Sequence, residues 1–313
     1  MDRVIAVARF APGVTPEWDD FVRRGRNGHF FFERGFMEYH ADRFEDHSLL
    51  FRDERGLRGI LPANRVGDTL YSHGGLTFGG LVVDRARGAE VIALLQRAAD
   101  TLAEQGFTRL VYKALPAFYH RQPAGDDLYA LHRMGARLVR RELSSVIDLT
   151  APFAFSGGKN DNLRRARKAG LQVEEVADPA PVIALVADVL ADRHGATATH
   201  SPAELQLLAA RFPENIRTFV ATRDGRLLAG AVMFLHPGVA HTQYLANSEE
   251  GLSCGALDFV VANLIRTVFA GRRWFSFGIS TENAGQDLNA GLLAYKEGFG
   301  GHGVTHDVYE LAL

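Results

Sequence analysis

Cysteine and long apolar stretches are scarce in this sequence. Of its 313 residues only Cys254 is a cysteine, so no internal disulfide can form and a reducing compartment is expected. The longest apolar run, residues 227–235, is far too short to span a bilayer, and the first residues lack the apolar region of a signal peptide. These absences exclude a disulfide-stabilised secreted domain and predict a soluble, cytoplasmic protein without a membrane span.

A surplus of either charge is also missing. There are 35 basic and 37 acidic residues, so a formal net charge of −2 creates no field that favours nucleic acid or an anionic membrane. We therefore expect small-molecule substrates and no nucleic acid. His194 and His200 flank a loop without cysteine or carboxylate at ligand spacing, so we expect no metal. The oligomeric state stays open, with a homodimer among the alternatives.

An internal repeat of predicted elements organises the chain. Residues 48–61 and 218–235 each predict a hairpin, with tight turns at residues 53–56 and 224–225. In each half a strand and two helices precede the hairpin, and strand, helix, strand, helix and strand follow it. The second of these helices in the second half has a clear start, a capping box at residues 201–204 with proline at the first helical position.

The repeat predicts two domains, residues 1–150 and 151–313, joined by a linker at residues 150–161. A chain of this length is sufficient for two ordinary domains with buried cores. We expect each domain to be a mixed, mostly antiparallel sheet flanked by helices. The predicted fold class is therefore α/β (α+β).

Residues 274–301 carry the most specific local pattern. Residues 274–279 are aromatic and β-branched with a glycine near the end, which predicts a buried strand whose tip lets another group approach. Residues 287–297 have apolar side chains at helical spacing, Tyr295 among them, and Gly298 follows as glycines do after helices.

Residues 289–292 and 294–299 resemble the last conserved block of the GNAT acyltransferase superfamily. This resemblance implies that Asn289 contacts the pantetheine arm of acyl-CoA and that Tyr295 protonates the departing thiolate. Both halves follow the GNAT order of elements, and a tandem pair resembles the FemAB-like group and its relatives that acylate nucleotide-linked amino sugars. Residues 162–170 resemble the basic helix that opens the second FemAB-like domain.

The resemblance implies an acyl-CoA-dependent N-acyltransferase. Its acceptor would be an amino group of a nucleotide-linked amino sugar or related cell-envelope precursor, which attacks the thioester directly. Acetyl-CoA or a short hydroxyacyl-CoA would bind to the second domain, and a degenerate first domain would lie on the acceptor side. Two alternatives remain: a FemAB-like transferase that moves an aminoacyl group from tRNA to a peptidoglycan precursor, and a noncatalytic GNAT-like ligand-binding protein.

In such a fold the chemistry lies where the strands at residues 239–246 and 274–280 diverge. Backbone groups in this gap would bond the pantetheine amides and the oxyanion. An amine must lose a proton before it attacks, so a base is needed, and His241 and Glu282 are the candidates. A core histidine and a turn carboxylate are the alternative interpretations. The residues expected to bind the cofactor are Gln243, Leu245, Ala246, Ser253, Gly255, Ala256, Ser280, Asn289 and Lys296.

The expected phosphate site departs from the family pattern. Residues 248–256 have a different glycine spacing, and Glu249 and Glu250 stand where an anion should bind. In the first half, residues 85–89 are more basic at the matching point and are an alternative phosphate site.

Two basic segments are candidates for acceptor binding. One is an aromatic and basic loop with Tyr119, His120 and Arg121, which suits a base and a diphosphate. The other is the basic helix with Arg164 and Arg165. A packed loop and a solvated helix face are the alternative interpretations.

Overall fold

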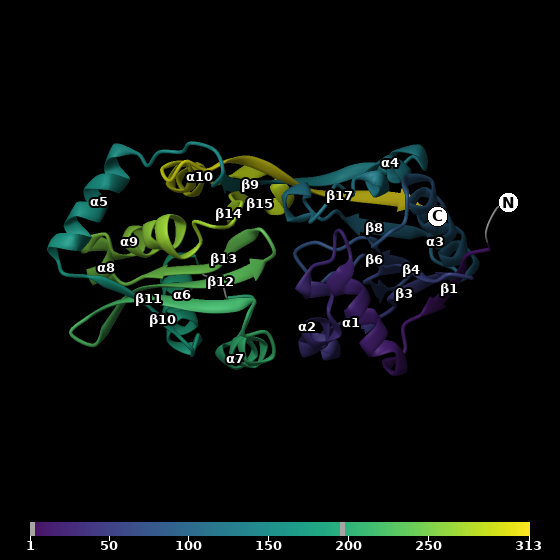
Figure 1. Cartoon of the computed structure of the whole chain (residues 1–313), viewed down its shortest axis with the longest axis horizontal. Helices are drawn as coiled ribbons and strands as arrows, with labels where there is room; N and C mark the ends of the chain where they lie inside the picture. Colours follow the sequence, from purple (N-terminus) through teal and green to yellow (C-terminus); the bar gives the residue numbers. More distant parts are fainter. Residues whose placement is uncertain (1–3, 195–197) are drawn as a thin grey trace. The chain divides into compact units, whose positions relative to one another are not determined.

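The computed structural model describes residues 4–194 and 198–313, and the side chains of residues 190–194 are left out of the description. The chain forms two compact units, Met1–Glu142 with Thr305–Leu313, and Leu143–Val304. In each unit mostly antiparallel strands are flanked by helices, which confirms the predicted fold class (Figure 1).

Two long strands determine where the units divide. β9 (Arg137–Asp148) begins in the first unit, and its residues 144–148 pair with β14 (Trp274–Ile279) of the second. β17 (His302–Ala312) ends in the first unit, where residues 308–312 pair with β8 (Arg109–Lys113). The units therefore differ from the expected division at residue 150, because backbone hydrogen bonds and not a linker decide where each strand belongs.

The first unit follows the predicted order of elements. Its helices are α1 (Thr15–Arg24), α2 (Arg34–Met37), α3 (Gly88–Glu104) and α4 (Asp126–Arg133), and its further strands are β1 (Ala6–Arg9), β2 (Glu45–Asp46), β3 (Leu49–Asp53), β4 (Gly56–Leu61), β5 (Asn64–Val66), β6 (Thr69–Tyr71) and β7 (Val82–Val83). One sheet has the order β1-β3-β4-β7, and the other strands of this unit follow the order β17-β8-β6-β5-β2. β6 and β8 run parallel.

The second unit has the strand order β10-β11-β12-β13-β14-β9, where β13 and β14 are parallel. Its further strands are β10 (Gln172–Val176), β11 (Ile216–Arg223), β12 (Arg226–His236), β13 (Val239–Asn247) and the small hairpin of β15 (Thr281–Glu282) with β16 (Asp287–Leu288). Its helices are α5 (Gly157–Lys168), α6 (Ala180–His194), α7 (Pro202–Arg211), α8 (Glu249–Cys254), α9 (Ala256–Asn263) and α10 (Ala290–Glu297). The shorter helical segments of the first unit are η1 (Pro12–Val14), η2 (Phe30–Phe32), η3 (Glu38–Arg43) and η4 (Ala117–Tyr119), and those of the second unit are η5 (Leu264–Val268) and η6 (Asn283–Gly285).

Helix starts agree with local capping chemistry. α7 begins with the predicted box, since the Ser201 hydroxyl accepts the Glu204 N–H and the Glu204 carboxylate accepts the Ser201 N–H. α5 begins inside the segment expected to be a linker, because the Ser156 hydroxyl caps it and overcomes the cost of two glycines.

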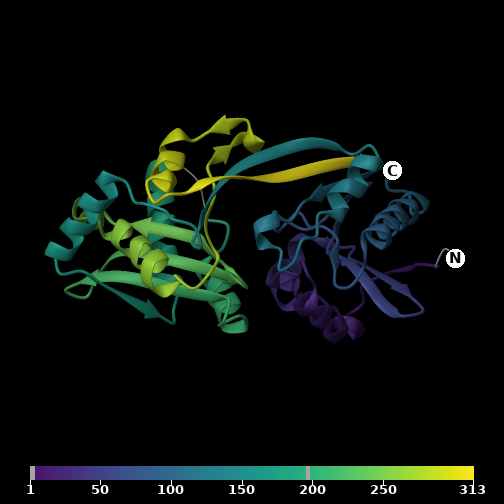
Figure 2. The ribbon, with the colours of Figure 1, turned by 45° about the horizontal axis from the view of Figure 1, so that its top comes forward.

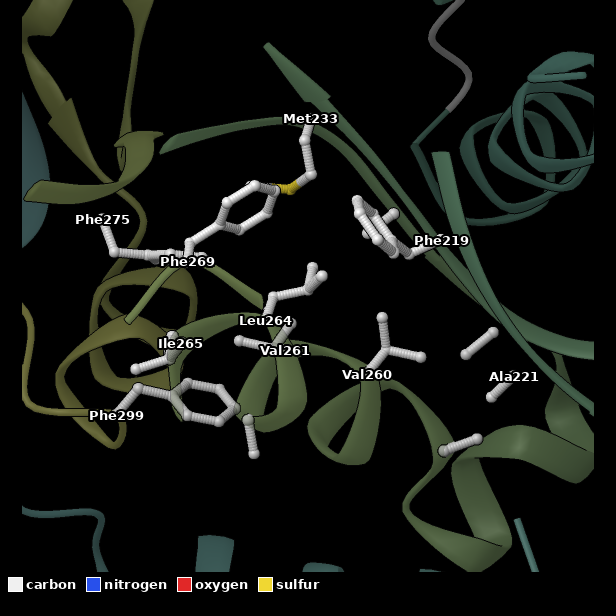
Figure 3. Packing of buried hydrophobic residues seen from close by; sticks show 14 of the residues in the cluster. Phe219, Ala221, Met233, Val260, Val261, Leu264, Ile265, Phe269, Phe275 and Phe299 are labelled. Atoms are coloured by element: carbon white, nitrogen blue, oxygen red, sulfur yellow. The ribbon is translucent and has the colours of Figure 1, made fainter. Parts of the chain in front are cut away.

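The core of the second unit lies between α9 and the strands. Figure 3 shows Val260, Val261 and Leu264 facing Phe219 and Met233, and all of these side chains are buried. α9 covers one face of strands β11 to β13, and α6 covers the other (Figures 1 and 2). Large aliphatic and aromatic side chains of this kind stabilise a fold by about 2–5 kcal/mol each.

Candidate active site

The parallel strands β13 and β14 pair over only part of their length. The register runs from Val239 with Trp274 to His241 with Ser276, and it ends there although β13 continues to Asn247. Both strands keep their outer partners, β12 and β9, beyond this point. The two strands therefore separate, and we call this place the strand gap.

A β-bulge lies on each side of the strand gap. In β13 the register against β12 jumps between Thr242 and Tyr244, which makes Gln243 the extra residue. In β14 the register against β9 jumps between Ser276 and Gly278. Bulges change the direction of side chains and are frequent beside active sites, so they explain how two neighbouring strands part here.

His241 lies at the base of the strand gap. Its Nδ1 is 3.0 Å from the Ser276 hydroxyl oxygen. Its ring also lies beside Gly278, where an added Cβ would be 3.3 Å from the His241 Cε1. Gly278 has a φ of +73°, which glycine adopts without strain. If Nδ1–H donates to Ser276, Nε2 is the basic nitrogen, as a general base requires.

Lys296 fixes the tip of β14. Its ammonium group is buried and donates to the carbonyls of Gly278, at 2.8 Å, and of Ile279. Burial lowers the pKa of Lys296 to about 8. Lys296, predicted to bind the cofactor, thus bonds the backbone of Gly278, the glycine that lies beside the His241 ring.

Tyr295, the predicted thiolate acid, packs away from these groups. Its ring lies 3.5 Å from the Lys159 Nζ, which an ion pair of 2.8 Å joins to Asp258. Burial, followed by the Asp258 carboxylate, raises the pKa of the Tyr295 phenol well above its usual value. A phenol in this setting gives up its proton less readily, so the acid role stays a prediction that this geometry does not favour.

Asn289 and Glu282 lie next to each other at the start of α10. The Asn289 side chain accepts the Leu292 N–H at 2.9 Å as the N-cap, and it donates to the Glu282 carboxylate at 2.9 Å. Glu282 is exposed in β15. Both residues thus stabilise the start of α10. The pantetheine contact of Asn289 and the base role of Glu282 stay predictions.

The remaining strand residues of the predicted site differ in burial. Leu245 packs against the core and Ala246 is buried opposite Gly230. Ser280 is fully buried; its N–H donates to Leu143 O and its carbonyl accepts the Asn289 N–H. Its hydroxyl has no hydrogen-bond partner among the described residues.

The start of α9 is covered by α5. A Cβ at Gly255 would lie 2.8 Å from the Asn162 carbonyl, and Ala256 is fully buried. The Asp258 carboxylate in the first turn accepts from Lys159 at 2.8 Å and from the Asn162 amide at 2.6 Å. A diphosphate expected at Gly255 and Ala256 would therefore have to displace α5.

Ser253, Arg164 and Arg165 are exposed. Ser253 donates its hydroxyl to Glu250 O at 2.7 Å. Arg165 donates to Ser253 O at 3.2 Å, and Arg164 pairs with Asp161. The Arg165 bond joins α5 to the segment before α9, whereas the pair of Arg164 with Asp161 lies within α5.

The loop with Tyr119, His120 and Arg121 belongs to the first unit and is packed. Tyr119 is 3% exposed among neighbouring aromatic rings. His120 Nε2 is 3.2 Å from Leu115 O, and burial lowers the pKa of this imidazole. Arg121 donates to Arg23 O. Tyr119 is thus a core residue, and acceptor binding by this loop stays a prediction.

Sequence reasoning missed Ser276 and the pair of Lys159 with Asp258. It did single out the glycine of the β14 pattern, Gly278, as a point of close approach, but not that His241 lies beside it. Among residues 4–194 and 198–313, no group of three or more potential ligands is placed to hold a metal ion. In the same part of the chain no helix combines the length and apolarity of a membrane span.

Comparisons with known proteins agree with this geometry. Residues 158–297 match the family model described as an acetyltransferase (GNAT) domain. None of the curated proteins matches. The structure of FemX is similar with a TM-score of 0.72 at 13% identity, over 98% of this chain and 97% of that one.

Two further solved structures share the fold. L-PGS from Bacillus licheniformis has a TM-score of 0.60 at 14% identity, over 96% of this chain and 90% of that chain. A tandem GNAT protein from the clavulanic acid biosynthesis pathway has a TM-score of 0.50 at 14% identity, over 98% of each chain.

GNAT domains generally use acyl-CoA and transfer its acyl group, so the chain is an acyltransferase of this type. Residues 158–297 thus carry a GNAT acetyltransferase domain, and the solved structures show the same fold over nearly the whole chain.

Proposed function

We propose that this protein transfers an acyl group to an amino group of a nucleotide-linked amino sugar or a related cell-envelope precursor. The donor, an acetyl- or short hydroxyacyl-CoA, lies in the strand gap. The amine attacks the thioester directly while His241 takes its proton. Small-molecule substrates and a cytoplasmic location are part of this proposal.

The proposal rests on the separation of β13 and β14 after His241 and Ser276. Backbone N–H and C=O groups that would otherwise bond a neighbouring strand can bond the amides of the donor. One N–H can also hold the oxyanion of the tetrahedral intermediate. A preorganised donor of this kind contributes about 10²-fold or more in rate. His241, at the base of the gap, supports proton removal in the same place.

A second candidate is aminoacyl transfer from tRNA to a peptidoglycan precursor. The cover of α5 over the start of α9 supports it, because Asn162 lies against Gly255, where we expected the CoA diphosphate, and Lys159 bonds Asp258 in the same turn. The exposed arginines of α5 are compatible with a phosphate backbone.

A thiol-release assay with acetyl-CoA and a panel of nucleotide-linked amino sugars tests the main proposal. We expect turnover with at least one acceptor, and no release with any acceptor contradicts it. Calorimetry separates the alternatives. Heat from CoA but not from aminoacyl-tRNA removes the second candidate, the reverse supports it, and no heat from either favours a noncatalytic protein.

A further inference from the structure

Helix α5 carries positive charges that the proposed reaction does not use. Its exposed cationic side chains are Arg164, Arg165, Arg167 and Lys168. Arg164 pairs with Asp161 in the same helix. Within residues 4–194 and 198–313, the side chains of Arg167 and Lys168 make neither an ion pair nor a hydrogen bond. These two cations at the end of α5 are therefore available to a partner.

The other side of α5 fixes the helix to the second unit. Leu163 and Ala166, three residues apart and so on one side of the helix, are buried in the core. Lys159 forms an ion pair of 2.8 Å with Asp258 of α9, and both side chains are largely buried. The two available cations thus lie on a helix that is already held in place, so a partner does not have to order this segment when it binds.

α5 also borders the helices that contact the strand gap. At its start the Ser156 N–H donates to Gly298 O at 2.8 Å, directly after α10. Further along, α5 packs on α9, and Figure 1 shows it beside α8 and α9. α9 contacts β13, and α10 holds the tip of β14 through Lys296. A molecule bound to α5 therefore stands next to both helices of the donor site.

The same helix covers the place where the nucleotide end of CoA was expected. The Asn162 carbonyl lies so close to Gly255 that an added Cβ would be 2.8 Å away, and Ala256 is fully buried. Exposed Glu249 at the start of α8 adds a negative charge to the segment before α9. A donor without an adenosine diphosphate avoids this obstacle, while its pantetheine arm can still enter the strand gap.

We propose that the acyl donor is a phosphopantetheine thioester carried by an acidic protein, which docks on Arg167 and Lys168 of α5. This inference rests on the proposed acyl transfer and changes only the carrier of the thioester; the acceptor stays a small molecule. The acceptor amine forms an amide bond with the acyl carbon while the C–S bond breaks. The amine proton reaches the departing sulfur by way of His241, and the carrier leaves as a free thiol.

Charge favours a protein over tRNA as the carrier. Nucleic acid presents phosphates along its whole length, and its affinity grows with the number of phosphates that a protein neutralises. α5 offers two available cations, and the whole chain has 35 basic against 37 acidic residues. A carrier protein needs only a few carboxylates beside its arm to match two cations. Exposed ion pairs are weak and screened by salt, so we expect a transient, salt-sensitive complex.

Titration with a bacterial acyl carrier protein, loaded with an acetyl-phosphopantetheine arm, tests the docking without an acceptor. We expect the wild-type protein to bind it at low ionic strength and the affinity to fall as salt is added. The variant with both Arg167→Glu and Lys168→Glu should bind at least about tenfold more weakly. Arg211→Glu is the matched control, because Arg211 is an exposed arginine at the end of α7, and its affinity should equal that of the wild type.

Thiol release with the acceptor found by the amino-sugar panel then measures transfer. We expect kcat/KM with the loaded carrier to exceed that with acetyl-CoA by at least about tenfold. The double variant should lose this advantage through a higher KM, while kcat stays unchanged. Its rate with acetylpantetheine should equal that of the wild type, which also shows that the variant is folded.

The outcomes separate this inference from the proposed function. Three results overturn the carrier proposal and leave acyl transfer intact: no binding of the carrier, equal binding by the double variant, or equal kcat/KM for acetyl-CoA and the carrier. Binding of the carrier without thiol release from any donor contradicts the proposed acyl transfer instead. Turnover with aminoacyl-tRNA but not with the loaded carrier would assign α5 to the tRNA alternative.

Discussion

Each unit has one parallel strand pair, β6 with β8 and β13 with β14, and both pairs stay in register over three residues. In the first unit the chain after β6 closes the space beyond the pair. Ser72 N–H donates to Val111 O, Gly79 N–H donates to Lys113 O, and the Ser72 hydroxyl accepts the Lys113 N–H at 2.7 Å. In the second unit the described register ends at His241 and Ser276, and the strands separate.

Side-chain size accounts for much of this difference. In the first unit Tyr112 fills the space: its hydroxyl accepts the Leu81 N–H at 2.8 Å and donates to Asp127 at 2.6 Å. Gly80 passes so close that an added Cβ would be 2.6 Å from this hydroxyl. In the second unit two small residues of β14, Ser276 and Gly278, lie beside His241. The same strand order therefore yields one filled position and one open one.

The largest effect is expected from His241→Ala, which removes the proposed base from the open gap. We expect acyl transfer to fall by about 10²–10⁴-fold and the neutral-pH limb of the rate profile to flatten. The measurement is turnover against pH with the acceptor found by the thiol-release assay. An unshifted profile would assign proton removal to Glu282 or to water.

Gly278→Ala tests whether the open gap depends on a residue without a side chain. The new methyl group would lie 3.3 Å from the His241 ring, at a φ of +73°. Displacement of the base by a fraction of an ångström should reduce turnover by up to about 10²-fold. Gly271→Ala is the control, because nothing lies within 4 Å of its added Cβ. Full activity in Gly278→Ala would contradict the proposal that the position of His241 depends on Gly278.

Asp127→Asn tests the filled position of the first unit through the pH dependence of folding stability. Burial raises the pKa of Asp127 to about 6. Between pH 4 and 6 the folded state then holds a proton that the unfolded state has lost, so folding stability falls as pH rises through this range. The contribution is at most about 3 kcal/mol. Asn does not titrate, so this part of the pH dependence of urea unfolding should disappear.

The exposed Asp100 provides the control for that measurement. Asp100→Asn should leave the dependence of unfolding on pH as it is in the wild type. A wild-type slope that persists in Asp127→Asn would mean that Asp127 is ionised in the folded protein.

Tyr112→Phe removes only the hydroxyl that bridges Leu81 and Asp127 in the first unit. Both partners then lose a hydrogen bond while buried, so the first unit should lose about 2 kcal/mol of stability. Hydrogen exchange at the Leu81 amide should speed up in proportion, while acyl transfer stays unchanged. Tyr129→Phe, on the exposed face of α4, should change neither. An unchanged exchange rate would show that the bridge does not hold this position closed.

Tyr295→Phe is expected to have the smallest effect on turnover. The phenol lies beside Lys159 and Asp258 instead of at His241, and its raised pKa makes it a poor acid. Turnover and CoA affinity measured together decide the question. A clear loss of turnover with CoA affinity kept would restore the acid role implied by the GNAT block.

Local patterns were sufficient for much of the fold. Turn residues, periodicity and the capping box at Ser201 predicted the repeated order of elements, because these signals act within a few residues of the chain. The same signals misplaced the start of α5, where the Ser156 cap outweighs the two glycines that follow it. They also could not predict that β9 and β17 each extend from one unit into the other, since strand pairing joins distant segments.

The sequence by itself determined the repeated order of elements and placed His241 on its strand and Tyr295 on its helix. The helix expected over residues 287–297 begins only at Ala290, because Asp287 and Leu288 pair in a hairpin and Asn289 is the N-cap. Tertiary structure alone decided that Ser276 and Gly278 meet His241, that Lys296 holds the tip of β14, and that α5 covers the start of α9. The reason is physical: spacing along the chain sets which residues share a helix or strand. Which distant side chains fill a gap or leave it open depends on packing of segments that the local pattern does not relate.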